Sequence, residues 1–134
     1  MVTLADFAGR WRLLRAIRHA DGGRARLAGE AVWTRDGAGL RSVETGRLET
    51  DGAAFEARRE TFWRQQPGGI AIAFMDGRPF HVIGPGPRVT ADHACAPDSY
   101  ALAYDFSAWP CWSVRWRVVG PRKAYRALSR YAPL

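Results

Sequence analysis

Short runs in which apolar and polar residues alternate make up most of this chain, and clusters of Asp, Gly and Pro separate them. A period of two is the pattern of a β-strand with one buried face, and Asp-Gly, Pro-Gly and Gly-Pro pairs favour tight turns. We therefore predict an all-β fold of about ten strands. Nine turns would separate these strands, at residues 21–22, 36–37, 51–52, 67–68, 76–77, 84–87, 96–97, 109–110 and 120–121.

The first three Asp-Gly pairs lie 15 residues apart, which suits long strands joined by hairpins. Because a barrel hides the edges of so long a sheet, we predict a single antiparallel up-and-down barrel. In front of it, Thr3 and Asp6 fit the capping pattern of a short helical turn, whose Leu4 and Phe7 would cover one end of the barrel.

Hairpin registers indicate which polar side chains share the interior. The Asp-Gly turn at 51–52 pairs Glu44 with Arg59. On the same face, the turn at 36–37 pairs Gly29 with Glu44, and the first turn pairs Arg15 with Gly29. We predict that Arg15, Glu44 and Arg59 form one polar layer inside the barrel, with Gly29 leaving space between the first two.

Two of the three histidines lie on neighbouring predicted strands. His81 falls opposite Ile72 on an apolar face, so we expect it to point inward, and His93 falls opposite Tyr100. The loop at 84–87, with two prolines and two glycines, leaves the register between these strands open.

Length and charge narrow the class of protein. A chain of 134 residues fits one domain, and we assign residues 1–134 to it. The net charge of +7 comes from 19 Arg and one Lys against 13 acidic residues, a bias that a GC-rich genome explains as readily as function does. Because the charges are dispersed along the chain instead of gathered in one run, we do not expect a nucleic-acid partner.

The first residues lack the basic region and long apolar run of a secretory signal, and no apolar run reaches the length of a membrane span. Cys95 and Cys111 are too few for a zinc cluster and are not spaced as a redox pair, which favours free thiols over a disulfide. We therefore expect a cytoplasmic protein with no membrane partner.

Several segments carry a family resemblance: GRW at 9–11, GEAVW at 29–33, DGRPFH at 76–81, HAC at 93–95 with Asp98 and Tyr100, and VRWRVVGPRKAY at 114–125. The Gly-x-Trp opening resembles that of lipocalins and related calycin barrels, in which the Trp closes one end and a late Arg packs over it. Here Trp11 would be that residue, with Arg126 or Arg130 as its partner. Over nearly the whole chain the sequence resembles an uncharacterised bacterial family, domain of unknown function 6314. The resemblance implies a lipocalin-like barrel and no established activity.

The predicted polar layer has two main interpretations, and an inverted face assignment would be a third. It is either a structural charge layer that satisfies itself, or an anion site in which Arg15, Arg59 or both bind a carboxylate or phosphate while Glu44 holds Arg59. Buried ion pairs give weak net stability, which favours a functional role.

The histidines fit hydrogen-bonded interior residues better than metal ligands. A zinc site needs three or four ligands, and only Cys95, Asp92 and Asp98 are near His81 and His93 in sequence. We predict no metal and no resident cofactor, with haem held by one inward His as an alternative.

We predict that the barrel interior binds a small, partly aromatic anionic ligand inside the cell. An enzyme is the main alternative, using His93 with Tyr100, or Glu44 with His81, for acid–base isomerisation, cyclisation or hydrolysis. No nucleophile elbow, phosphate loop or metal motif accompanies these pairs. The candidate ligand-binding residues are Arg15, Glu44, Arg59, His81, His93, Tyr100, Trp116 and Tyr125.

Overall fold

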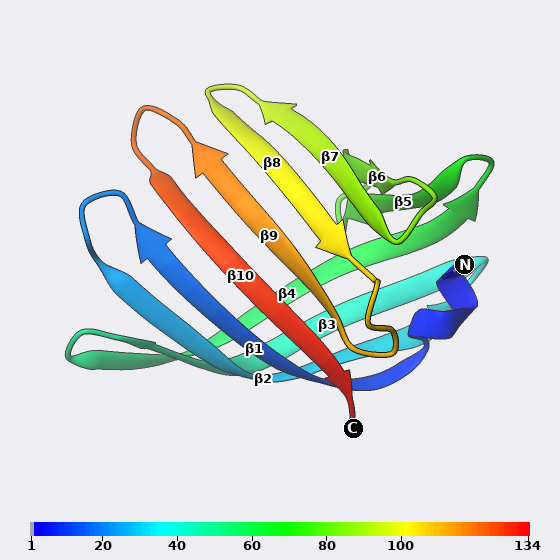
Figure 1. The fold of residues 1–134 in the computed structure, drawn as a ribbon, viewed down its shortest axis with the longest axis horizontal. Helices are drawn as coiled ribbons and strands as arrows, with labels where there is room; N and C mark the ends of the chain where they lie inside the picture. Colours follow the sequence, from blue (N-terminus) through cyan, green and yellow to red (C-terminus); the bar gives the residue numbers. More distant parts are fainter. Residues whose placement is uncertain (1) are drawn as a thin grey trace.

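The computed structural model describes residues 2–134 and has ten strands preceded by one short 3₁₀ turn, η1 (Leu4–Phe7) (Figure 1). The all-β prediction and the ten strands are confirmed. The strands are β1 (Gly9–His19), β2 (Arg24–Asp36), β3 (Gly39–Thr50), β4 (Ala53–Gln66), β5 (Gly69–Phe74), β6 (Pro79–Ile83), β7 (Arg88–Cys95), β8 (Asp98–Asp105), β9 (Trp112–Val119) and β10 (Ala124–Pro133).

All ten strands belong to one antiparallel sheet in the order β6-β5-β4-β3-β2-β1-β10-β9-β8-β7. The sheet curls until its two edge strands, β6 and β7, come into contact, but no hydrogen-bonded ladder joins them within residues 2–134 (Figure 1). The barrel is therefore nearly closed, and its seam lies at the loop 84–87. Pro79, Pro85 and Pro87 have no N–H to donate, which is consistent with a seam at this place.

The predicted register is confirmed for β3–β4, where Glu44 faces Arg59, and for β7–β8, where His93 faces Tyr100. On β5–β6 His81 faces Ile72 as predicted, but a bulge then sets Pro79 opposite Ala73 instead of Phe74.

Three predicted registers are wrong by two residues. Arg15 faces Leu27 instead of Gly29, and Glu44 faces Ala31 instead of Gly29. The alternation along the last two strands predicts Tyr125 opposite Trp116, but Trp116 faces Ala127. The cause is the turn geometry: the loop between β2 and β3, for example, is centred one residue later than its Asp-Gly pair. Because side chains alternate along a strand, a shift of two leaves every one of them on its predicted face.

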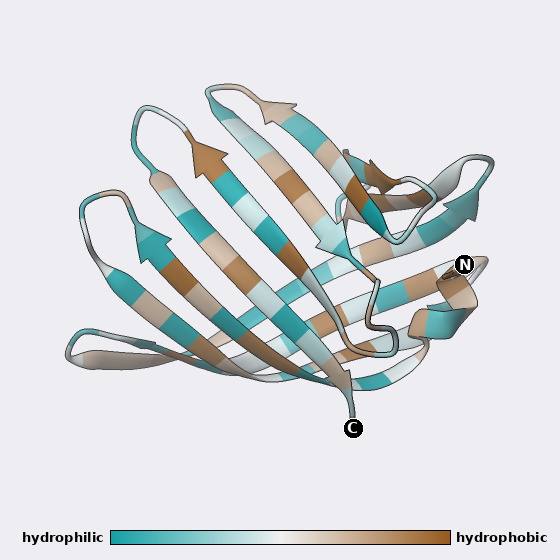
Figure 2. Ribbon diagram, in the orientation of Figure 1, coloured by the Kyte–Doolittle hydropathy of each residue, from teal (hydrophilic) through white to brown (hydrophobic). Residues whose placement is uncertain are grey.

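One end of the barrel is closed by an aromatic core. Phe7 of η1 is fully buried and packs against Trp33, Trp63, Phe106, Trp109 and Trp112. Hydrophobic and hydrophilic positions alternate along the strands of the barrel (Figure 2). The predicted capping interaction forms, since the Thr3 backbone N–H donates to the Asp6 carboxylate at 2.7 Å. Burial of these rings is the main source of stability at this end.

The predicted cation–π contact on Trp11 does not form. Arg126 and Arg130 are exposed on the outer face of β10, and the Trp11 indole N–H donates instead to the Phe7 carbonyl at 2.8 Å. Cys95 and Cys111 are exposed and unbonded, and no helix in residues 2–134 is long and apolar enough to cross a membrane.

Candidate functional site

A buried cluster of four polar side chains joins β1, β3 and β10 inside the barrel: Arg15, Glu44, Ser129 and Tyr131. The Arg15 guanidinium, 9% exposed, donates to Glu44 Oε1 at 2.8 Å and to Ser129 Oγ at 2.6 Å. The Tyr131 hydroxyl donates to the other Glu44 oxygen. Both oxygens of Glu44 are thus occupied, and the two opposite charges of Arg15 and Glu44 neutralise each other.

The protonation states of Glu44 and Tyr131 are fixed by their buried surroundings. Burial by itself would raise the pKa of Glu44, but Arg15 and Arg59 outweigh it and lower that pKa below its usual value. Burial and the charge of Glu44 together raise the pKa of Tyr131 well above that of free tyrosine. Glu44 therefore stays ionised and Tyr131 stays a hydrogen-bond donor at neutral pH.

Arg59 has a different environment from Arg15. Its guanidinium lies over the Trp116 ring, with Cζ 4.4 Å from the ring centroid. Although Glu44 is its partner in the ladder, no hydrogen bond or ion pair within residues 2–134 engages the half-buried Arg59 side chain. The structure thus bonds Glu44 to Arg15 and leaves Arg59 near this carboxylate without a bonded counter-ion of its own.

A cavity of about 310 Å³ adjoins this cluster on the side away from η1. Its mouth is formed by residues next to the turns, among them His19, Thr50 and Tyr125. Arg15, Glu44, Arg59 and Trp116 belong to its lining, and aliphatic side chains such as Ile17, Leu27 and Leu48 complete the walls.

A second, much smaller chamber lies deeper in the barrel. It measures about 30 Å³, the space of about one water molecule, and shares Glu44, Arg59 and Trp116 with the larger cavity. His81 and Tyr104 lie in its lining. Arg59 and Trp116 therefore contribute to the lining of both spaces.

His81 points inward as predicted, and its Nε2 lies 2.7 Å from the Tyr104 hydroxyl. Burial, with a smaller contribution from His93, lowers the pKa of His81 to about 4. His93 and Tyr100 lie outside the lining of both cavities and pack against Phe80, with ring centroids 5.2 and 5.7 Å away.

The structure therefore brings five of the eight predicted residues together at the larger cavity: Arg15, Glu44, Arg59, Trp116 and Tyr125. His81 lies one chamber deeper. Tyr104, Ser129 and Tyr131 were not among the predicted residues. The sequence does contain a signal for two of them. Ser129 and Tyr131 follow Tyr125 at even spacing, which places them on the inward face of the last strand, and Ser129 is a polar residue in an otherwise apolar pattern.

The residues of the larger cavity do not include a metal site. Across residues 2–134, no group of three or more His, Cys, Asp or Glu side chains is arranged to hold an ion. What the arrangement offers is one guanidinium without a bonded counter-ion, an indole surface and an apolar wall. These are the elements of an anion site with room for an aromatic group.

An antiparallel barrel closed at one end by an N-terminal turn, with an interior cavity at the other end, defines a lipocalin-like barrel of the calycin type. The family model described as "Family of unknown function (DUF6314)" matches residues 7–133, so the chain belongs to that family.

Two solved structures share the fold. The S-type phycobiliprotein lyase CPES from Guillardia theta superposes with a TM-score of 0.70 at 8% identity, covering 98% of this chain and 90% of that one. A protein of unknown function from the DUF3598 family of Nostoc punctiforme PCC 73102 gives a TM-score of 0.66 at 8% identity, covering 100% of this chain and 50% of that one. A search of the curated proteins found no match.

Proposed function

We propose that this protein binds a small, partly aromatic anion in the 310 Å³ cavity, with Arg59 as the group that recognises its negative charge. The observation that carries the proposal is the position of the Arg59 guanidinium, which lies over the Trp116 ring in the cavity wall and has no ion-pair partner among residues 2–134. The Arg59 N–H groups have no hydrogen-bond acceptor within residues 2–134, and a guanidinium matches a carboxylate or phosphate in geometry.

Neighbouring residues support a ligand at this place. Arg15 and Glu44 neutralise each other, so the layer as a whole keeps one positive charge. The Trp116 indole N–H is buried and has no acceptor within residues 2–134. The Trp116 ring contributes to the lining of the cavity. The cavity has the volume of about ten water molecules, at the small end of the usual range for ligand pockets.

The aliphatic and aromatic lining indicates that the rest of the ligand is apolar. Leu27, Leu48 and Ile17 give the cavity an apolar wall that would cover a ring better than a chain of hydroxyl groups. Tyr125 at the mouth would contact the ligand's outer end. The fold itself does not choose the ligand, because sites of many kinds are built on barrels of this class.

The geometry favours binding over acid–base catalysis. His81 hydrogen-bonds Tyr104 in the 30 Å³ chamber, which has no space for a substrate or for a porphyrin. Its pKa of about 4 and the raised pKa of Tyr104, both caused mainly by burial, leave neither group poised to exchange protons near neutrality.

Isothermal titration with two probes of similar shape tests the proposal: 2-naphthoate, which is anionic, and 2-naphthamide, which is neutral. We expect the wild-type protein to prefer the naphthoate by at least about tenfold, because a charge-assisted hydrogen bond is worth about 1.5–3 kcal/mol. In Arg59→Gln that preference should disappear.

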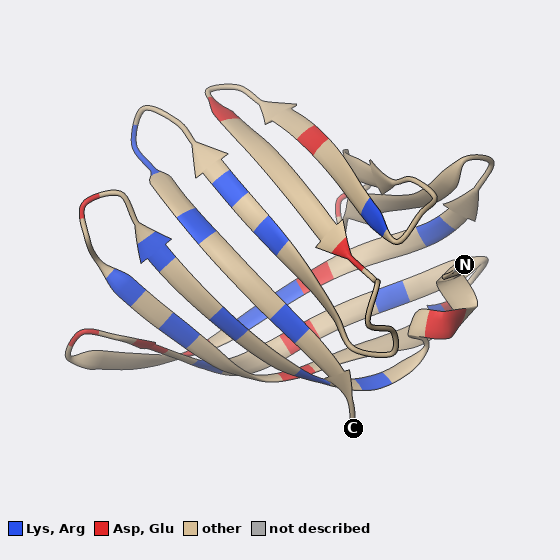
Figure 3. Ribbon diagram, viewed as in Figure 1, with Lys and Arg blue, Asp and Glu red and all other residues tan. Residues whose placement is uncertain are grey.

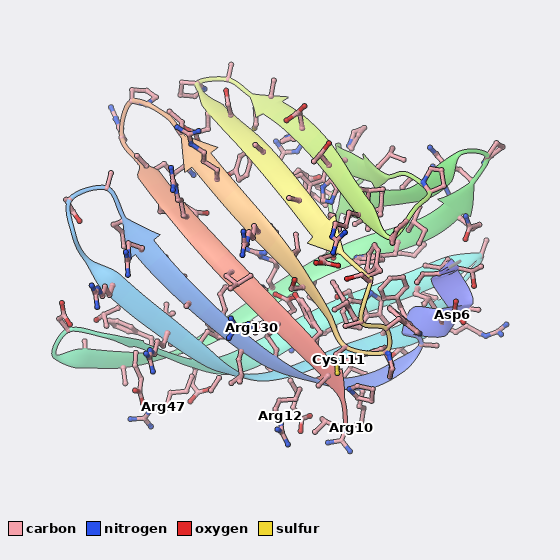
Figure 4. All side chains as sticks on the ribbon, in the orientation of Figure 1. Asp6, Arg10, Arg12, Arg47, Cys111 and Arg130 are labelled. Carbon is pink, nitrogen blue, oxygen red and sulfur yellow. The ribbon has the colours of Figure 1, made fainter. Side chains whose placement is uncertain are left out.

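Arg47→Gln is the matched control, since Arg47 carries the same charge on the outer face and points away from the barrel (Figure 4). It should keep the preference for naphthoate. Equal affinities for the two probes in the wild-type protein, or an unchanged preference in Arg59→Gln, would contradict the proposal.

A further inference from the structure

Four arginines stand directly opposite one another across four adjacent strands on the outside of the barrel. Arg24 of β2 faces Arg18 of β1, Arg18 faces Arg126 of β10, and Arg126 faces Arg117 of β9. We call these four residues the arginine row. All four are exposed, and at a strand spacing of about 4.8 Å the row spans about 15 Å.

The arginine row is not paired with carboxylates. Within residues 2–134, none of its members takes part in an ion pair, although like charges facing each other across a ladder destabilise a sheet. Three outer arginines of β3 and β4 differ from the row, because Arg41, Arg47 and Arg58 each pair with an acidic side chain. Figure 3 shows the basic residues side by side on β2, β1, β10 and β9.

An apolar strip runs beside the arginine row. The next set of facing residues places Ala16 opposite Leu128, with Arg26 and Arg115 at the two ends. One step further, Leu14 is 50% exposed. A hollow of about 630 Å³ lies over this part of the sheet and includes Ala16, Leu128 and members of the arginine row in its lining.

Small apolar side chains ringed by arginines resemble the centre and rim of a protein–protein interface, where Arg is enriched. A surface for single-stranded nucleic acid would need exposed aromatic rings, and the outward positions of these strands carry none. A surface for duplex DNA would need only the charges and would gain nothing from the apolar strip. The combination therefore favours an acidic protein partner.

We propose that the outer face of β2, β1, β10 and β9 docks an acidic surface of another protein. Carboxylates of the partner would bind the arginine row, and an apolar side chain between them would cover Ala16 and Leu128. Arg18 directly precedes His19, and Arg126 directly follows Tyr125. Because His19 and Tyr125 line the cavity mouth, the partner would bind beside the entrance to the cavity.

Fluorescence anisotropy with a labelled 20-residue amphipathic helical peptide, bearing glutamates on both sides of a leucine stripe, tests the docking face. We expect the peptide to bind more tightly at 150 mM salt than a version with serine in place of leucine, a 20-base-pair DNA duplex or vesicles containing phosphatidylserine. The double variant R117Q/R126Q should bind it at least fivefold more weakly.

R41Q/R47Q is the matched control, because it removes the same amount of charge at two outer arginines that are already paired. It should bind the peptide within twofold of wild type. Equal losses in both variants, no preference for leucine over serine, or tighter binding to the duplex or the vesicles would overturn the proposal. Naphthoate binding by R117Q/R126Q, expected to match wild type, shows that the variant is folded and separates this proposal from that of the cavity.

Discussion

Among single residues, Glu44 is the acceptor that joins the polar cluster, because each of its oxygens accepts a hydrogen bond and its charge is the counter-ion of Arg15. Glu44→Gln keeps the size of the side chain but leaves the Arg15 guanidinium buried without its counter-ion. Removing one partner of a buried ion pair typically costs about 3–5 kcal/mol, and we expect a loss of that order in the free energy of unfolding.

Urea denaturation at pH 7.5 measures this loss. Glu60→Gln is the control, because its pairs with Arg41 and Arg58 are on the surface and should cost less than about 1 kcal/mol. If the two variants were equally stable, Glu44 would not be the centre of the polar layer.

His81 makes the stability of the fold depend on pH. Its pKa in the folded protein is about 4, below the value of 6.5 for free histidine, so the unfolded chain binds the proton first as the pH falls. Stability is therefore fully present above pH 6.5 and declines between pH 6.5 and 4. Between pH 7.5 and 5 we expect a loss of about 2 kcal/mol from this residue.

Urea denaturation of wild type and His81→Gln at several pH values between 5 and 7.5 isolates this effect from the carboxylates, which titrate mainly at lower pH. The variant should lose less stability than the wild type across this range. Identical pH dependence in the two proteins would show that His81 is protonated as easily in the folded state as in the unfolded chain.

At the scale of elements, β2 and β3 approach each other closely where Gly29 faces Gly46. A Cβ atom at Gly29 would lie 1.9 Å from the Thr45 carbonyl oxygen, a backbone atom that cannot move aside without shifting the strand. Gly29 thus permits close approach of two backbones, and does not leave space between Arg15 and Glu44 as the sequence suggested.

Gly29→Ala should therefore lower the free energy of unfolding by about 1–3 kcal/mol, the usual cost of overpacking. Gly84→Ala is the control, since a Cβ atom there meets nothing within 4 Å and the backbone needs no unusual φ. Chemical denaturation of both variants gives the comparison, and a Gly29→Ala protein as stable as the control would refute the close approach.

The elements also show what alternation can and cannot predict. The inward direction of Arg15, Glu44, Arg59 and His81 followed from the period of two and holds even where the register was wrong by two residues. Which guanidinium pairs with Glu44 did not follow, because that depends on the rotamers of long side chains that meet across the barrel. Arg15 reaches Glu44 from a strand that is not its ladder neighbour.

In the whole molecule, the two ends of the barrel differ in what fills them. The end near η1 is packed with aromatic rings, and the other end holds the cavity lined by charged and aliphatic side chains. The closure by Leu4 and Phe7 could be predicted from the short capped turn. The seam between β6 and β7 could not, because the loop between them carries no pairing information of its own.

The central claim is that the Arg59 guanidinium receives the anion inside the barrel, and nuclear magnetic resonance of the arginine Nε–Hε groups tests it most directly. The Arg59→Gln spectrum identifies the Arg59 signal, and 2-naphthoate is then titrated into the wild-type protein. We predict that the Arg59 Nε–Hε and Trp116 indole N–H signals shift together and saturate with one ligand per chain. Shifts confined to exposed arginines, with Arg59 and Trp116 unchanged, would contradict the account.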